Sequence, residues 1–138
     1  MASIKTILNG YVRYKGREGQ MSFLLHRITG LGTLLFLTIH ILDTSTVFFF
    51  PELYNHGIAI YRTTLFGIGE MILIFCVIYH GVNGLRIALF DRYPHLWTIE
   101  NARKWSLSTL GLAILLWLPV LVIMSRNILM HNYGLFGG

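Results

Sequence analysis

The sequence IFCVIYHGVNGLRIALFD, residues 74–91, decides the fold, because it is an apolar run with a histidine near its centre. A lipid-spanning helix needs about 20 mostly apolar residues, and an ionisable group at that depth is costly without a partner. His80 is therefore a candidate functional residue by default. Gly81 and Gly84 follow it and leave space on the helix surface for a flat cofactor or a second helix. Our working hypothesis is that His80 is an axial ligand of a b-type haem.

The composition is that of a membrane protein. Hydrophobic residues make up 54% of the 138 residues and charged residues 12%, against roughly 25% charged in an ordinary soluble chain. Three stretches are long enough to cross a bilayer, at about 23–49, 65–90 and 105–125. The sequence therefore predicts an all-α membrane protein with three transmembrane helices in one domain, residues 1–138, beginning with a short segment, residues 1–20.

The basic residues predict the orientation of these helices. The net charge is +5, and most Lys and Arg residues lie before the first span or between the second and third. The positive-inside rule then places the N-terminus in the cytoplasm and the C-terminus outside. The charge is thereby explained by topology and gives no indication of nucleic-acid binding. The basic segment 1–20 is either an anchor at the headgroups or a docking strip for a peripheral partner.

The first span carries two further histidines within SFLLHRITGLGTLLFLTIHILDTS, residues 22–45. At about 100° per residue, one stripe of this helix is almost entirely small or polar. Close helix packing explains the glycine and the threonines, but it does not explain two histidines on one stripe. The stripe consists of His26, Gly30, Thr33, Leu37, His40 and Thr44.

The relative depth of the histidines depends on how the two helices are aligned. If Arg27 is level with Asp91, His40 and His80 lie at similar depth and serve one haem region. If Arg27 is level with Arg86, His40 lies roughly 10 Å deeper than His80 by helical rise, which indicates two haems. The sequence leaves both arrangements open.

Polar groups also gather toward the predicted cytoplasmic ends of the first two spans, namely Ser22, His26, Arg27, Arg86 and Asp91. Hydroxyl, guanidinium and carboxylate groups in an apolar setting suit a pocket for a quinone, which needs a donor to each carbonyl oxygen and a route for protons. Arginine side chains equally suit haem propionates, or they reach out to lipid phosphates.

One acidic residue is expected near the opposite membrane surface, away from this group of polar residues. Glu70, early in the second span, is expected near the outer interface, facing partner helices, with no assigned role.

Two motifs resemble one family. The string LLHRITG, residues 24–30, resembles the H-R-x-[ST]-G signature of the cytochrome b subunit of succinate dehydrogenase. The string YHGVNGLRIALFD, residues 79–91, resembles that family's H-x-x-x-G-x-R motif followed by an aspartate. Their order, their separation by one external connection and the three-helix length agree, and the match covers roughly residues 21–93. The short bacterial form, which continues with H-[IV]-L-D-T, is similar to residues 40–44 here.

The resemblance implies that His80 is an axial ligand of haem b, shared with a histidine from a second membrane anchor subunit that packs with this chain into one bundle. His40 matches members that hold a second haem, as a ligand of its iron. His26 and Arg27 match positions near the haem propionates.

The resemblance also implies a quinone pocket lined by Arg27 and Asp91. The family's pocket serine sits four residues before the arginine. Here that position is Phe23 and the serine is one residue earlier, Ser22, so Ser22 is the candidate donor.

As a whole, the resemblance implies a non-succinate-binding subunit of succinate:quinone oxidoreductase, respiratory complex II, in the bacterial inner membrane. A flavoprotein would oxidise succinate in the tricarboxylic acid cycle, an iron–sulfur subunit would pass the electrons to quinone, and the whole complex would be a monomer or a trimer. An anchor of a quinol:fumarate reductase would have the same sequence features. The alternatives from other classes are a haem-free helical scaffold or assembly protein and a stand-alone membrane cytochrome.

Overall fold

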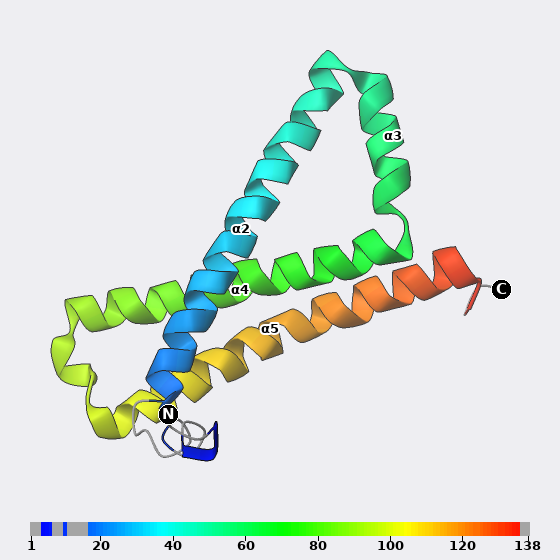
Figure 1. Ribbon diagram of the computed structural model, residues 1–138. Helices are drawn as coiled ribbons and strands as arrows, with labels where there is room; N and C mark the ends of the chain where they lie inside the picture. Colours follow the sequence, from blue (N-terminus) through cyan, green and yellow to red (C-terminus); the bar gives the residue numbers. More distant parts are fainter. Residues whose placement is uncertain (1–3, 7–9, 11–16, 136–138) are drawn as a thin grey trace.

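The computed structural model describes residues 4–6, 10 and 17–135, and this part of the chain is helical (Figure 1). Three helices are long and apolar enough to cross a membrane, as the sequence predicts. Most of the basic segment 1–20 lies outside the described residues, so its docking role stays a prediction. The elements are α2 (Arg17–Phe49), α3 (Pro51–Tyr61), α4 (Thr64–Arg92), the short 3₁₀ helix η1 (Pro94–Leu96) and α5 (Ile99–Tyr133).

The connection between the first two spans contains a helix of its own. Pro51 ends α2 and at the same time starts α3, because its missing N–H is not needed in the first turn of a helix and its φ is preset for one. Gly57 lets α3 approach α2, since a Cβ there would lie 3.3 Å from Asp43 Oδ1. In the same connection the pKa of the Tyr61 hydroxyl is raised, mainly because the hydroxyl is shielded from water and also because of the negative charge of Asp43. Pro51 therefore marks a change in the direction of the chain as well as the end of an apolar run.

The ends of α5 follow from local sequence. The Thr98 side chain caps its start by accepting a hydrogen bond from the Asn101 backbone N–H at 3.2 Å. Gly134 ends it with a left-handed φ of 64°, a conformation that glycine adopts without strain. The helix continues through Pro119 and has 35 residues, about 52 Å at 1.5 Å per residue. It is therefore longer than the hydrocarbon core of about 30 Å.

Helix α4 is the centre of the arrangement. It lies alongside α5, while α2 crosses it and then runs away from it (Figure 1). Helix α3 returns from the far end of α2 to the start of α4, so α2, α3 and α4 form the sides of a triangle. The functional residues predicted on α2 and α4 therefore meet only where these two helices cross.

Small residues permit the close contacts along α4. A Cβ at Gly67 would lie 2.7 Å from Ile128 Cδ1 of α5, and one at Gly32 would lie 2.7 Å from Cys76 Sγ of α4. Trp117 of α5 also donates a hydrogen bond of 2.9 Å from Nε1 to the Met71 carbonyl oxygen of α4. The pattern is typical of helices in lipid, where close backbone approach and hydrogen bonds replace the hydrophobic effect.

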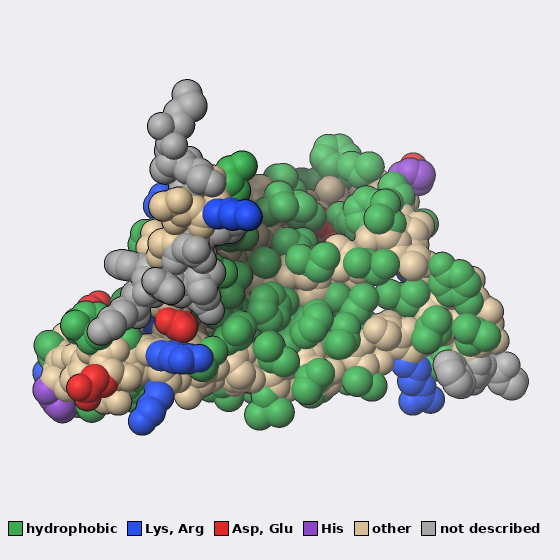
Figure 2. All heavy atoms as spheres, turned by 60° about the horizontal axis from the view of Figure 1, so that its bottom comes forward, with side chains coloured by type: hydrophobic (Ala, Val, Ile, Leu, Met, Phe, Trp, Pro, Cys, Tyr) green, Lys and Arg blue, Asp and Glu red, His purple; other side chains and the backbone are tan. Residues whose placement is uncertain are grey.

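The interior is polar and the exterior apolar. Among the described residues the buried apolar side chains are Met71, Tyr79 and Ala113, whereas large hydrophobic side chains are exposed along all three spans. Figure 2 shows hydrophobic side chains over the middle of the face in view and charged ones toward its ends. This distribution suits a lipid environment. The buried polar residues are Ser22, Thr29, Asn83, Ser106 and Thr109.

Enlarging Gly67 tests the α4–α5 contact. We expect Gly67→Leu to destabilise the detergent-solubilised protein by about 1–3 kcal/mol, because the added side chain must displace Ile128 or separate the helices. Gly69→Leu is the matched control, since nothing lies within 4 Å of a Cβ at that position. Thermal unfolding of both variants measures the difference. Equal midpoints would show that the two helices do not touch at Gly67.

Candidate functional site

The site begins where α2 crosses α4, at two stacked histidines. The rings of His26 and His80 are nearly parallel, at an interplanar angle of 5°, with their centroids 4.1 Å apart. Gly30, one turn after His26, makes room for the His80 ring, because a Cβ there would lie 2.9 Å from His80 Cε1. Gly30, a member of the polar stripe predicted for the first span, is thus required by His80.

The hydrogen bonding of His80 fixes which of its nitrogens is free. Nδ1 lies 3.1 Å from the backbone carbonyl oxygen of His26. A carbonyl only accepts, so Nδ1 carries the proton and the lone pair of a neutral ring is on Nε2. Histidines that ligate metals through one nitrogen commonly donate from the other to a carbonyl or carboxylate. Nδ1 of His80 is thus engaged within the protein, and Nε2 is the nitrogen left for a ligand.

A network of five polar side chains ties the three spans together beside this pair. Arg86 of α4 donates from Nη2 to Ser22 Oγ at 2.9 Å and from Nη1 to Ser106 Oγ of α5 at 3.1 Å. Ser22 donates to Asn83 Oδ1 at 3.1 Å, and Tyr79 OH lies 3.2 Å from the same Ser22 oxygen. Once the serine proton goes to Asn83, Tyr79 is the donor in the remaining bond. Ser22 then has its proton and both lone pairs engaged by protein groups.

A cavity of about 920 Å³ adjoins the network at the same end of the bundle. Ligand pockets are usually about 300–1,000 Å³, largely apolar, with a few convergent polar groups. Glu18 of α2 and Arg103 of α5, both on its wall, form an ion pair of 3.6 Å. The lining residues are Glu18, Gly19, Gln20, Phe23, His26, Asn83, Arg86, Ile87, Phe90, Asp91, Pro94, Trp97, Ile99, Ala102, Arg103 and Ser106.

Three buried nitrogen atoms of this wall have no hydrogen-bond partner among the described residues. They are His26 Nδ1, Asn83 Nδ2 and Arg86 Nε. A buried donor or acceptor left without a partner costs about 1–3 kcal/mol, so the presence of three such atoms around one cavity is not explained by packing. Asn83 is the clearest case, since the residue is 0% exposed and its other amide atom is already used by Ser22. The cavity is suited to a ligand that carries acceptor oxygens.

The other predicted residues are placed as follows. Asp91 lies on the cavity wall and is exposed. Arg27 is also exposed but does not line the cavity, and its guanidinium lies over the Phe23 ring, 5.5 Å from the ring centroid. His40 is exposed and stacks on Phe36 at 5.6 Å. It lies fourteen residues after His26, about 21 Å along α2, so His26 rather than His40 accompanies His80.

The alignment of α2 and α4 differs from both arrangements considered from the sequence. Ser22, five residues before Arg27, is the residue that contacts Arg86, so Arg27 is level neither with Arg86 nor with Asp91. Instead Arg27 adjoins the turn that contacts His80. The roles assigned to Arg27, Asp91 and His40 stay predictions.

Three residues of the network, Asn83, Tyr79 and Ser106, were not predicted from the sequence. Asn83 carried a signal, since it lies three residues after His80 and three before Arg86, on neighbouring turns of one helix. An amide in a lipid span is uncommon enough to suggest a partner. Ser106 had no such signal, because a serine near the start of a third span is ordinary.

Comparison with known proteins identifies the family. Residues 3–120 match the model of the family described as succinate dehydrogenase/fumarate reductase transmembrane subunit, and both motif strings lie inside that range. The chain belongs to this family. It is also similar to the succinate dehydrogenase 2 membrane subunit SdhC of Mycobacterium tuberculosis (strain ATCC 25618 / H37Rv), at 30% identity over 118 residues, 86% of this chain and 85% of the relative. The resemblance inferred from the motifs is therefore confirmed, and the protein is a succinate dehydrogenase-type membrane subunit.

Removing the guanidinium of Arg86 tests the three-helix network of this subunit. We expect Arg86→Met to lower the stability of the subunit by about 1–3 kcal/mol, because Ser22 and Ser106 lose a charged donor. Arg92→Met, an exposed arginine at the end of the same helix, is the control and should change it little. Thermal unfolding in detergent measures both. An equal shift for the two variants would contradict the bracing role of Arg86.

Proposed function

We propose that this chain is one half of the membrane anchor of a bacterial succinate:quinone oxidoreductase, binds haem b through His80, and forms part of a quinone-reduction site. In this proposal a flavoprotein oxidises succinate, and an iron–sulfur subunit delivers the electrons at the end of the bundle where the cavity lies. The observation that carries the proposal is the cavity beside the histidine pair, with its three unpartnered nitrogens. The chain itself contributes no succinate chemistry.

The support for haem lies in the surroundings of His80. Its Nδ1 is held by the His26 carbonyl, and its Nε2 has no hydrogen bond among the described residues. Gly30 provides the space that the ring needs. His80 would hold the iron from this side, and a sister anchor subunit would supply the second ligand. Haem b, when bound, supplies one-electron transfer; His26 and Arg27 would interact with its propionates.

The support for quinone lies in the donors of the cavity. Reduction of a quinone to quinol takes two electrons and two protons, and negative charge develops on the carbonyl oxygens before the protons arrive. Asn83 Nδ2 would donate to one of these oxygens. Asp91, exposed on the same wall, would collect protons from the aqueous side.

Two predicted roles change in this proposal. Ser22, whose hydrogen-bonding capacity is taken up by three neighbours, would hold Asn83 and Arg86 in position and would not contact quinone itself. Arg27 would act toward the haem propionates or the lipid surface, because it is not on the cavity wall. His40 would serve a second haem or a contact with the sister subunit.

The family description names both succinate dehydrogenase and fumarate reductase, so the reverse reaction, quinol-dependent fumarate reduction, is the second candidate. The direction would be set by the quinone and by the potentials of the partner subunits.

The haem ligand is tested by reduced-minus-oxidised absorption spectra of the purified complex. We expect His80→Ala to remove the b-type signal, or one of two, while the flavoprotein and iron–sulfur subunits still co-purify. His56→Ala, an exposed histidine on α3, should leave the spectrum unchanged. An assembled His80→Ala complex with a full b-type signal would refute the ligand.

The quinone donor is tested by kinetics. Asn83→Leu removes the unpartnered N–H, and we expect it to raise the KM for quinone about tenfold, the equivalent of one lost hydrogen bond of roughly 1.4 kcal/mol. Succinate oxidation with a soluble dye that takes electrons from the peripheral subunits should be unchanged. Asn101→Leu, an exposed asparagine at the start of α5, is the control. An unchanged KM in an assembled, haem-containing variant would remove Asn83 from the site.

A further inference from the structure

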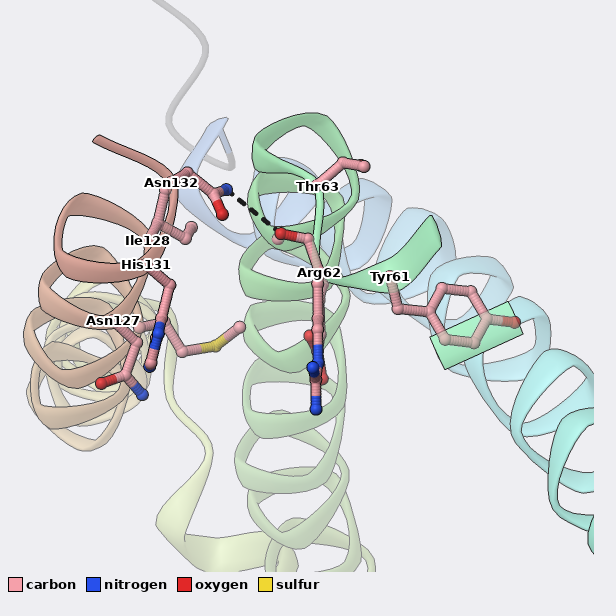
Figure 3. Close-up of a pocket in the computed structure, with 10 residues that line it drawn as sticks. Tyr61, Arg62, Thr63, Asn127, Ile128, His131 and Asn132 are labelled. Atoms are coloured by element: carbon pink, nitrogen blue, oxygen red, sulfur yellow. Dashed lines mark hydrogen bonds between the residues drawn. The ribbon is translucent and has the colours of Figure 1, made fainter. Parts of the chain in front are cut away.

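A second pocket lies at the opposite end of the bundle, between the start of α4 and the end of α5 (Figure 3). Its volume is about 550 Å³. Figure 3 shows the Arg62 side chain extending along α4, while His131 and Asn127 face it from α5. Glu70, six residues into α4, also lines it, together with the apolar side chains of Met124 and Ile128. The network and the cavity described above share no residue with this pocket.

The wall of the pocket is held by interactions of its own. Asn132 donates from Nδ2 to the Arg62 carbonyl oxygen at 3.1 Å and to Thr64 Oγ1 at 2.9 Å, which joins the end of α5 to the start of α4. Gly67 of α4 and Ile128 of α5 pack directly against each other at the same helix–helix contact. The pocket is therefore a built feature of the α4–α5 pair.

Four polar residues that line the pocket are exposed and have side chains without partners among the described residues. The side chains of Arg62, Glu70, Asn127 and His131 make no hydrogen bond or ion pair there, although Arg62 and Glu70 have opposite charges. A carboxylate within a lipid span is costly unless it is paired, and is by default a functional-site hypothesis. Glu70 is exposed and lies about 9 Å along the helix from Thr64, near the end of the span and close to the level of lipid headgroups.

We propose that this pocket binds the headgroup of an aminophospholipid, a phosphate diester joined to a primary ammonium group. Arg62, with His131 and Asn127 beside it, would donate to the phosphate, for which a guanidinium is suited in shape and charge. Glu70 would accept from the ammonium group. Met124 and Ile128 would contact the start of the acyl chains, which favours a lipid over a water-soluble phosphate.

The charge balance of the pocket predicts its selectivity. One arginine and one carboxylate match a headgroup with one negative and one positive charge. Phosphatidylglycerol would bring no cation to Glu70, and phosphatidylcholine would bring a cation without an N–H donor. The pocket should therefore select phosphatidylethanolamine from a mixture of the three.

Native mass spectrometry of the whole complex, released from bilayers containing the three lipids, tests this selectivity. We expect the wild-type complex to retain phosphatidylethanolamine with about tenfold enrichment over phosphatidylcholine, as for one charge-assisted hydrogen bond. Arg62→Gln and Glu70→Gln should both abolish the enrichment. Arg126→Gln is the matched control, since Arg126 is an exposed arginine on α5 outside the pocket and its loss should leave the enrichment intact.

The remaining outcomes overturn the proposal. Equal retention of the three lipids by the wild type, or preferential retention of phosphatidylglycerol, would show that the pocket does not recognise a zwitterionic headgroup. Loss of enrichment in Arg126→Gln would show a general effect of surface charge. Displacement of the lipid by inorganic phosphate alone would show a simple anion site. Co-purification of all subunits and an unchanged haem spectrum establish that each variant is assembled.

Discussion

The crossing of α2 over α4 depends on close approach at two glycines, Gly30 against the His80 ring and Gly32 against Cys76. A side chain at position 30 would occupy the space of the imidazole, so glycine at this position is one condition for the close approach of the two backbones. The approach brings the His26 carbonyl within hydrogen-bonding distance of His80 Nδ1 and stacks the two rings. The tautomer of His80 and the angle between the helices are therefore fixed by the same few atoms.

The same crossing explains why the interior of the bundle is polar. Lipid tails are as apolar as leucine, so apolar contacts between helices gain little, and hydrogen bonds between helices carry more of the association. Ser22, Arg86 and Ser106 join three spans in this way. Arg86 and Asn83 nevertheless keep unpartnered nitrogens beside the cavity. In the proposed function, the groups that stabilise the bundle would also provide donors to a ligand, so one network would serve both folding and binding.

The sequence was sufficient for the class of fold, and insufficient for the site. Periodicity gives the angle of a residue around its helix, and this was enough to predict three spans and to select His26 and His80. It gives no information on which turn of one helix meets which turn of another. Both alignments considered for Arg27 therefore missed the contact between Ser22 and Arg86. Asn83 was overlooked for the same reason, because its importance depends on a neighbour 61 residues away in the chain.

A single copy of this chain leaves part of α2 without a protein environment. Beyond the crossing, α2 diverges from α4, and its exposed side chains include Leu37, His40 and Ile41. The two aliphatic residues are as stable in lipid as in protein, so they do not require a partner. An imidazole does, because a polar group in the hydrocarbon region is costly unless it is paired. The stack of His40 on Phe36 satisfies neither ring nitrogen. The sister anchor subunit of the proposed function would supply on this face the partner that the His40 ring lacks among the described residues.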